Sequence, residues 1–335
     1  MGVKATVITP TNRPNGYKYA LHALREQTMP QEDWELIIVD DYLKDRAQIL
    51  EEAEELGLEN VRVFESKPNY WRSNRLIANA RNTALIYAEG ELIVFLDDYC
   101  WVRPKWLEEH WRTYRRGPYT MVGAMRAVKY VPGRYHRMDL VPPPEPGENY
   151  WEERERLRTW EPKEQKERTR EVGHFWVTDS RGRRPKRDCG GGWFYCCNAS
   201  APLEKIVEVN GFDEEFDLTS EEDIDLGLRL ERVGCRFWYR PDYECTVFHV
   251  DHRWVDSGAR AKKYREVSYE ELRRRGVLES EPDEVQLVLK EKYGTQYDGS
   301  WGLLERNRKR GPVANIVNGV KIFDLREERR RVRRE

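Results

Sequence analysis

A run of five apolar residues that ends at two carboxylates constrains this chain more than any other stretch. Leu92 to Leu96 is too short for a separate helix and has the length and composition of a strand buried on both faces. Asp97 and Asp98 follow it directly. Ligands of parallel α/β sheets bind at the carboxyl ends of strands, and two adjacent acids there need a cation or a hydrogen-bond donor. The pattern therefore predicts either a solvated acidic turn or a site for a divalent cation that bridges to phosphate.

The first hundred residues alternate between strand patterns and helix patterns. Short apolar runs predict three strands before the run just described, at 3–9 (broken by Pro10), 35–39 and 61–64. Apolar residues at helical spacing, or a helix-favouring composition, predict helices at 17–27, 47–56 and 74–88. Such alternation is typical of an α/β fold with a parallel sheet and right-handed crossovers.

Composition limits the classes of protein that this chain can belong to. Its 335 residues can bury a sizeable core, as one large domain or two modest ones. The 58 basic and 60 acidic side chains nearly balance, and the net charge is −2. The protein therefore has no overall electrostatic field that would direct it towards nucleic acid or a membrane. We find neither a run of 18 apolar residues nor a basic-then-apolar leader, so we expect a cytoplasmic protein, or one peripheral to a membrane.

Cysteine usage favours a reducing compartment. The six cysteines show no paired Cys-x-x-Cys spacing, and Cys196 and Cys197 are neighbours. Free thiols are the expectation, and a zinc site is the alternative.

Four short motifs in the first half occur in the order that they have in family 2 glycosyltransferases. They are Thr9-Pro10-Thr11-Asn12-Arg13, Trp34 to Asp41, Ala80-Arg81-Asn82-Thr83, and Asp97-Asp98 with the later Pro104-Lys105-Trp106-Leu107. The chain thus resembles that family, which has the GT-A fold, a Rossmann-like and mostly parallel sheet. The resemblance implies a metal-dependent, inverting transfer of a sugar from a nucleotide diphosphate sugar, here a UDP-sugar, to an acceptor hydroxyl.

The resemblance also implies which residues bind the nucleotide sugar. They are Thr9, Pro10, Thr11, Asp41, Arg81 and Asp97. Asp41 would hold the base edge of a pyrimidine, because a carboxylate accepts from a ring N–H and rejects analogues that lack the donor. Arg81 would lie near the diphosphate, a task that suits the planar fork of donors on arginine. Taken alone, Asp41 could also be an acidic residue in a turn, and Arg81 could lie on a solvent-exposed helix face.

The implied metal ligands are Asp98 and His249, which would hold Mn²⁺ or Mg²⁺. The commonest family version of this motif carries a third acid where this chain has Tyr99, which moves the metal ligand to Asp98. His249 is chosen over His252 because it ends the apolar run of its predicted strand. A histidine with satisfied hydrogen bonds in the core is the alternative.

A second pair of acids resembles the catalytic motif of the family. Asn210 to Phe216 is followed by Glu221-Glu222-Asp223, in which the resemblance makes Asp223 the general base and Glu222 its catalytic neighbour. The same residues fit a helix start, with Ser220 as N-cap and Asp223 at the capping-box spacing. The helix dipole would then lower the pKa of Asp223 and weaken it as a base. We expect Ile224 and Leu228 to face the core and Gly234 to end the helix.

A glycine-rich stretch is the candidate acceptor site. Gly191 and Gly192 allow a ligand to approach the backbone closely, and Trp193 offers a ring that stacks on a sugar. In the resembling family this segment forms the floor of the acceptor pocket, so the expected partner is a carbohydrate, a lipid-linked sugar or another hydroxyl compound. The basic run from Arg181 to Arg187 either grips an anion or is a solvated loop.

These motifs divide the chain into three predicted regions. Residues 1–125 form the donor-binding half and residues 126–256 the acceptor-binding and catalytic half of one GT-A domain. Beyond Ser257 the resemblance ends. Residues 257–335 read as a charged, helical appendage that packs on the core or meets a partner, with further helices at 268–271 and 282–293 and an Arg-rich end.

Three other functions remain open at the level of sequence. A nucleotidyltransferase shares the fold but is expected to have a Gly-rich, basic loop after the first strand, which Thr9-Pro10-Thr11 is not. Tyr99 leaves room for a non-catalytic relative that binds a carbohydrate or a partner. The basic loop and tail leave room for a nucleic-acid-binding protein, or for its hybrid, a glycosyltransferase that acts on nucleic acid.

Overall fold

The computed structural model describes a large part of the chain. The described residues are 2–12, 16–41, 46–68, 77–117, 119–123, 125–128, 172–174, 187–218, 221–240, 242–250, 304, 307–309, 311–317 and 320–334. Within these residues, no helix combines the length and the apolar character needed to cross a membrane.

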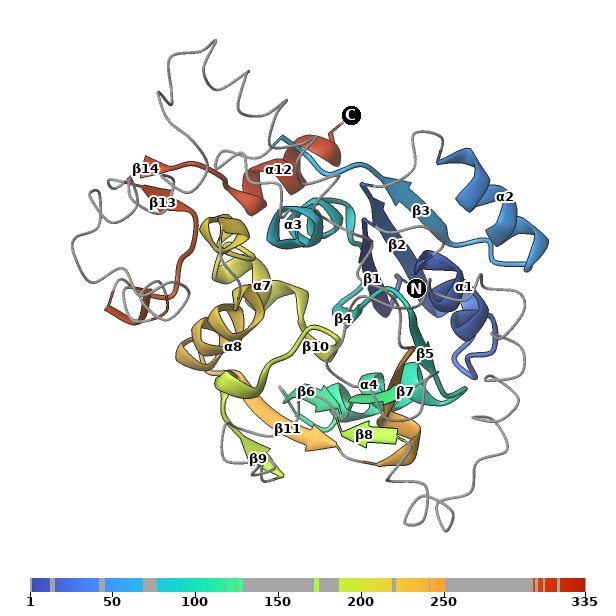
Figure 1. The fold of residues 1–335 in the computed structure, drawn as a ribbon. Helices are drawn as coiled ribbons and strands as arrows, with labels where there is room; N and C mark the ends of the chain where they lie inside the picture. Colours follow the sequence, from blue (N-terminus) through green and yellow to red (C-terminus); the bar gives the residue numbers. More distant parts are fainter. Residues whose placement is uncertain are drawn as a thin grey trace, which may run out of the picture.

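An eight-stranded sheet with the order β3-β2-β1-β4-β10-β6-β11-β9 forms the centre of the molecule (Figure 1). Strands β3, β2, β1 and β4 run parallel. β10 is antiparallel to both β4 and β6, β11 is parallel to β6, and β9 closes the edge in the antiparallel sense. The strands span Ala5–Thr11 (β1), Trp34–Asp40 (β2), Val61–Phe64 (β3), Leu92–Leu96 (β4), Tyr119–Gly123 (β6), Asp188–Cys189 (β9), Asn198–Pro202 (β10) and Arg236–Arg240 (β11).

Helices cover both faces of this sheet, because the residues of its strands alternate between two cores. Leu92, Val94 and Leu96 of β4 face a core with α1, α2 and α4, whereas Ile93 and Phe95 face one with α3, α7, α8 and α12. The helices span Gly16–Arg25 (α1), Ala47–Glu55 (α2), Ile77–Tyr87 (α3), Trp106–Arg115 (α4), Leu203–Glu208 (α7), Glu222–Arg232 (α8) and Leu325–Val332 (α12). The predicted α/β class with a mostly parallel sheet is confirmed.

Smaller elements complete the described structure. A second sheet has the order β5-β12-β7-β8, and β13 pairs with β14. These strands span Cys100–Val102 (β5), Met125–Val128 (β7), Val172–His174 (β8), Val247–Val250 (β12), Ile316–Val317 (β13) and Val320–Lys321 (β14). Four 3₁₀ helices span Gln31–Asp33 (η1), Gly191–Trp193 (η2), Glu214–Leu218 (η3) and Tyr243–Cys245 (η4).

Two local predictions are wrong. Pro10 does not break the first strand, which continues to Thr11. β1 pairs with β4 only as far as Ile8 and beyond it with β2 alone, so the proline lies where one side of the strand needs no ladder hydrogen bond. In α8 the apolar residues of the buried face are Leu226 and Leu230, not Ile224 and Leu228.

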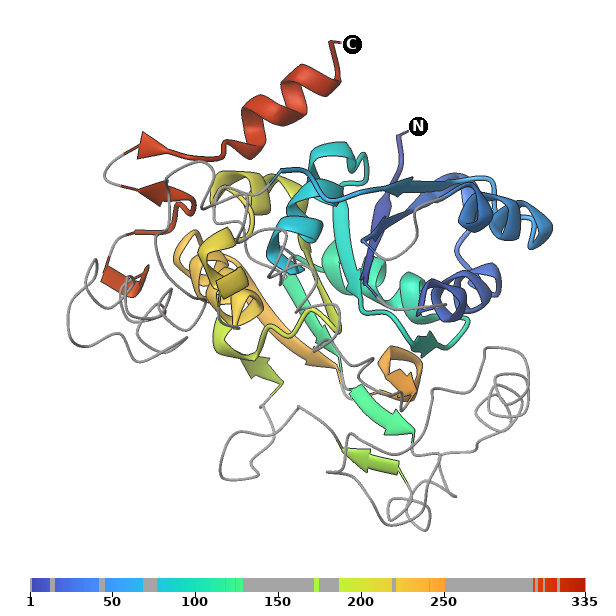
Figure 2. The same ribbon diagram turned by 45° about the horizontal axis from the view of Figure 1, so that its top comes forward.

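The C-terminal residues belong to the main core. Phe323 and Leu325 are buried in the core that contains α3, and α12 lies along α3 at the top of the molecule (Figure 2). The part of the predicted appendage that the structure describes, within 304–334, therefore packs on the core that contains α3. The predicted helices at 268–271 and 282–293 lie outside the described residues.

Candidate active site

The carboxylate of Asp98 joins the ends of two central strands. Asp98 follows β4 and is only 5% exposed, and its Oδ2 accepts a hydrogen bond of 3.0 Å from Oγ1 of Thr11, the last residue of β1. Gly16 begins α1 against it, since a Cβ on Gly16 would lie 2.9 Å from Asp98 Oδ2. Two residues predicted separately for the nucleotide loop and the metal site are therefore in direct contact.

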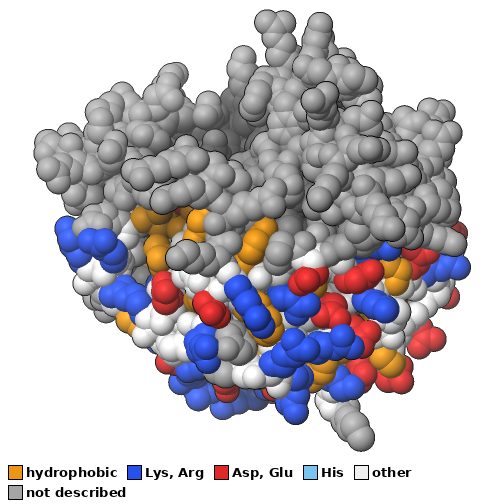
Figure 3. All heavy atoms as spheres, turned by 90° about the horizontal axis from the view of Figure 1, so that it is seen from below, with side chains coloured by type: hydrophobic (Ala, Val, Ile, Leu, Met, Phe, Trp, Pro, Cys, Tyr) orange, Lys and Arg blue, Asp and Glu red, His pale blue; other side chains and the backbone are white. Residues whose placement is uncertain are grey.

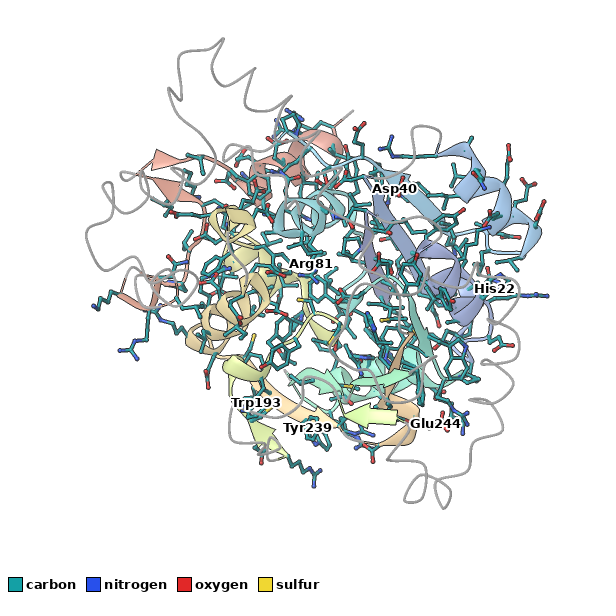
Figure 4. The ribbon with its side chains drawn as sticks, in the orientation of Figure 1. His22, Asp40, Arg81, Trp193, Tyr239 and Glu244 are labelled. Carbon is teal, nitrogen blue, oxygen red and sulfur yellow. The ribbon has the colours of Figure 1, made fainter. Side chains whose placement is uncertain are left out.

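Arg81 is buried and forms the centre of an ionic cluster; Figure 4 labels its place in the fold. Its Nη2 lies 2.9 Å from Asp97 Oδ1 and its Nη1 lies 2.5 Å from Glu222 Oε1. The guanidinium also lies over the ring of Phe212, 5.5 Å from the ring centre. Arg81 is not on a solvated helix face, because only 4% of its side chain is exposed. It connects β4 to the first turn of α8.

Asp223 lies in the first turn of α8, beside Glu222. Its Oδ2 accepts from the backbone N–H of Cys196 at 3.2 Å, and its Oδ1 accepts from that of Ile224 at 2.8 Å. Burial, together with the charge of Glu222, raises the pKa of Asp223 from 3.8 to about 8. The sequence suggested that the helix dipole would lower this pKa, but burial raises it.

The predicted capping box is not the arrangement at this helix start. The N-cap is Glu221, in a left-handed conformation with φ of 74° and no side-chain cap hydrogen bond. Asp223 is then the second helical residue rather than the third, and Ser220 lies outside the described residues. The capping interpretation of Asp223 therefore loses its geometric basis.

Asp41 lies next to the end of β1 but already has a local partner. Its backbone N–H donates to Thr11 O, and its two carboxylate oxygens accept from the N–H and the hydroxyl of Ser66 at 3.0 and 2.7 Å. Burial raises the pKa of Asp41, although the bonds from Ser66 lower it. Thr9 and Pro10 are buried in β1, and Thr9 Oγ1 finds no hydrogen-bond partner among the described residues.

Asp98 and His249, the residues predicted to bind a divalent metal, have an oxygen and an imidazole ligand to offer. β12 pairs with β5 so that His249 lies opposite Cys100, two residues beyond Asp98 in sequence. Among the described residues, no group of three or more His, Cys, Asp or Glu side chains gathers to hold a metal alone. Mg²⁺ in particular is often bound by one or two carboxylates, with water and phosphate in its other positions. Asp98 offers a carboxylate oxygen for a metal of that kind, and His249 offers an imidazole nitrogen.

The glycine-rich turn η2 packs closely on α8. A Cβ on Gly191 would lie 2.2 Å from the backbone oxygen of Gly227, so contact with α8 is sufficient to require glycine here. A Cβ on Gly192 would meet nothing within 4 Å, which leaves room for a ligand. Trp193 is partly buried and lies well apart from Arg81, on the side of β9 (Figure 4).

The comparison with protein families identifies this arrangement. The model of glycosyl transferase family 2 matches residues 6–187, more than half of the chain. The chain belongs to glycosyl transferase family 2. Its mostly parallel sheet with helices on both faces is the GT-A arrangement expected from the sequence.

Two curated relatives of this family 2 chain are validoxylamine A glucosyltransferases. They come from Streptomyces hygroscopicus subsp. limoneus and subsp. jinggangensis (strain 5008), and each is 27% identical over 242 residues. The matches cover 68% of this chain but only 48% and 51% of the relatives. The chain therefore spans about half the length of these proteins.

Solved structures with similarity to the family 2 chain include the following two. TarS 1–349 of S. aureus is 20% identical with a TM-score of 0.47, and the match covers 81% of this chain and 65% of that one. The mannosyltransferase PcManGT of Pyrobaculum calidifontis, in complex with GDP-Man and Mn²⁺, is 15% identical with a TM-score of 0.48. That match covers 91% of this chain and 73% of the other.

Sequence reasoning on this family 2 chain missed several residues around the acids. Ser66 binds Asp41, and Cys196 supplies a backbone donor to Asp223. Cys196 and Cys197 are free thiols, and burial raises the pKa of each well above its ordinary value, so neither is activated as a thiolate nucleophile. The only sequence signal for them was their position beside the glycine-rich turn, which says nothing about their contacts.

The two glycines of η2 give a matched test of packing against ligand binding. We expect Gly191→Ala to lower the free energy of unfolding by about 1–3 kcal/mol, because the new methyl group overlaps backbone of α8. Gly192→Ala should leave it unchanged within about 0.5 kcal/mol, the usual range for a surface substitution. Urea denaturation of both variants measures the difference. Equal stabilities would show that α8 does not need glycine at position 191.

Proposed function

We propose that the protein is a metal-dependent, inverting glycosyltransferase that moves a sugar from a UDP-sugar to an acceptor hydroxyl. One observation carries the proposal. The contacts Thr11–Asp98, Arg81–Asp97 and Arg81–Glu222 bring together four parts of the chain that hold residues assigned to the donor, the metal and the catalytic base, with Asp97 next to Asp98 and Glu222 next to Asp223. These four parts are separate, so neighbouring positions in sequence do not explain the contacts.

The donor half of the proposed site lies at the carboxyl ends of β1, β2 and β4. Thr9, Pro10 and Thr11, the end of β1, are the proposed nucleotide contacts, and Asp41 accepts from the pyrimidine ring. Ser66 uses one acceptor position on each oxygen of Asp41, and each carboxylate oxygen has a second lone pair for a nucleotide. Asp97 meets the ribose, while Arg81 lies near the diphosphate.

The proposed metal ligands are Asp98 and His249. A Mn²⁺ or Mg²⁺ ion bound there would stabilise negative charge on the leaving diphosphate. Thr11 and the start of α1 hold the carboxylate of Asp98 in place, so its orientation is set by β1 and α1. His249 contributes from the neighbouring strand of the second sheet.

Asp223 is the proposed general base for the acceptor hydroxyl. Its raised pKa brings it near the operating pH, where a base accepts a proton most effectively. Glu222 holds Arg81 from the preceding position in α8. A single in-line displacement inverts the anomeric centre, and the protonated thiols of Cys196 and Cys197 offer no covalent route. Gly192 and Trp193 are the proposed acceptor contacts, and the relatives named as glucosyltransferases support the transferase class.

Replacement of Asp98 tests the proposed function. Calorimetry should show that Mn²⁺ strengthens the binding of UDP to the parent protein, and that Asp98→Ala abolishes this metal-dependent part. The parent with EDTA is the control, and its UDP affinity should equal that of the variant. If Mn²⁺ strengthens UDP binding to the variant as much as to the parent, Asp98 is not the ligand.

Three arginines around one tryptophan ring are the observation that favours the alternative, a nucleic-acid acceptor. Trp238 of β11 is surrounded by Arg187, Arg116 and Arg240, which lie 4.4, 5.7 and 5.3 Å from its ring centre. Figure 3 views the molecule from below and shows Lys and Arg side chains grouped on part of the described surface. A gel shift that weakens with salt would favour this acceptor over a neutral sugar. The other members of the basic run, 181–186, lie outside the described residues.

A further inference from the structure

Helix α3 carries Arg81 and is held at both ends by distant parts of the chain. At its N-terminal end, Asp217 Oδ1 accepts from the backbone N–H of Ala78 at 2.7 Å and Asp217 Oδ2 accepts from that of Asn79 at 3.1 Å. Asp217 lies in η3, five residues before Glu222. The segment that leads to the proposed catalytic acids therefore also fixes the start of the helix that carries Arg81.

The C-terminal end of α3 is held by Arg329 of α12. Arg329 donates through Nη1 to the backbone oxygens of Leu85 and Ile86 and through Nη2 to that of Ala88, the last at 2.7 Å. The side chain is buried, and burial lowers its pKa to about 10, so the group is still charged at neutral pH. A cation at the carbonyl end of a helix is favoured by the helix dipole.

The C-terminal segment is itself fixed to the same turn that contacts α3. Asn210 donates to Ala314 O and Phe323 O and accepts from the N–H of Leu325, so it fixes the entry into α12. Two residues later, Phe212 exchanges two hydrogen bonds with the side chain of Asn82 of α3. The turn after α7, the C-terminal segment and α3 thus form one hydrogen-bonded unit.

This unit has a consequence for Arg81, because the helix is short and the guanidinium needs accurate placement. Arg81 is the fifth residue of α3 and must reach Asp97 and Glu222 at once. A shift of α3 along its axis would break one of these contacts, and a misplacement of about 1 Å at a catalytic centre can cost ~10² in rate.

We propose that the described C-terminal residues from Ala314 to Arg329 form a brace for α3 and that Arg329 is a positioning residue, which acts on the donor site through Arg81. This role goes beyond the proposed function but rests on it, since it takes Arg81 to lie at the donor diphosphate. The brace makes the C-terminal segment part of the machinery for donor binding, where the sequence suggested an appendage.

The test compares neighbouring arginines of α12 in the full chain. Calorimetry measures UDP affinity in the presence of Mn²⁺. Arg329→Met should bind UDP at least tenfold more weakly, whereas Arg330→Met should stay within twofold of the parent, since Arg330 is exposed and pairs only with Glu327 among the ion pairs of the described residues. Arg329→Lys should recover part of the affinity because it keeps the charge.

A double-mutant cycle separates positioning from general stabilisation. If Arg329 acts through Arg81, adding Arg329→Met to Arg81→Lys should weaken UDP binding no further. Parental affinity in folded Arg329→Met, or fully additive losses in the cycle, would overturn the proposal. Should Arg329→Met fail to fold, Arg329→Lys and Arg81→Lys give the same cycle.

Failure of the proposed function gives a different result. If the parent itself does not bind UDP with Mn²⁺, the proposed donor is wrong whatever α12 does. Amide hydrogen exchange of residues 78–82 then tests the brace without a ligand. Faster exchange in Arg329→Lys than in Arg330→Met supports it, and equal exchange in the two variants overturns it.

Discussion

Asp223→Asn is expected to lower the rate of sugar transfer by at least ~10² while nucleotide binding persists. Loss of a general base typically reduces a rate by ~10²–10⁴, or about 3–5 kcal/mol of barrier. Asparagine keeps the volume of the side chain and an oxygen that accepts one of the N–H groups of Cys196 and Ile224, but it cannot take a proton from the acceptor. Steady-state transfer rates for the two proteins measure the effect, with UDP calorimetry as the control for binding.

The pH dependence of the parent enzyme should carry the signature of the same group. The active form of a general base is deprotonated, and the pKa of Asp223 is raised to about 8, so the rate should rise with pH up to about that value. Asp223→Asn should lose this limb of the profile.

The stability of Asp223→Asn follows from the same raised pKa. Folding opposes ionisation of Asp223, so the carboxylate lowers the stability of the parent as pH rises from the ordinary value towards about 8. The asparagine variant lacks that charge and should melt within a few degrees of the parent, or above it at high pH. A variant that melts far lower but keeps most of its turnover would leave Asp223 a structural residue.

Arg81→Met is expected to lower the free energy of unfolding by about 3–5 kcal/mol, the usual cost of removing one partner from a buried ion pair. Glu222 is 11% exposed in its side chain and would lose its cationic partner, while Asp97, at 32%, could be compensated in part by water. Urea denaturation measures the loss.

Arg81→Lys is the matched control for that substitution. Lysine keeps the charge but lacks the planar fork that reaches two carboxylates at once, so we expect a smaller loss of stability. If the methionine variant unfolds at the same urea concentration as the lysine variant, Arg81 does not compensate the two acids.

The part of the site that could be predicted from the sequence is the part that depends on patterns of neighbouring residues. The run from Leu92 to Leu96 is continuous and apolar because β4 lies in the middle of the sheet, and it was placed correctly to the residue. The position of Asp97 and Asp98 at its end followed from that. Tyr99 adopts a positive φ of 55° directly after them, and no side-chain pattern predicted this turn.

Contacts between segments that are distant in the chain could not be predicted from the sequence. Arg81 and Glu222 are 141 residues apart, and Arg329 meets Leu85 across 244. The buried face of α8 was misread because Asp225 and Arg229 form a buried ion pair on it, 2.7 Å apart, and hydrophobic periodicity does not detect such a pair. In the Arg-rich C-terminus, composition did not distinguish Arg329, which is buried, from its exposed neighbours.

Thermal shift with a panel of nucleotide sugars tests the central claim most directly. The protein is melted with UDP-glucose, UDP-galactose, UDP-N-acetylglucosamine or GDP-mannose, each with Mn²⁺ and with EDTA. A ligand at about 100 times its Kd adds about 2.7 kcal/mol to the stability of the folded state. We predict that at least one UDP-sugar raises the melting temperature by several degrees with Mn²⁺ and much less with EDTA. Equal melting temperatures for every UDP-sugar under both conditions would contradict a metal-dependent UDP-sugar site.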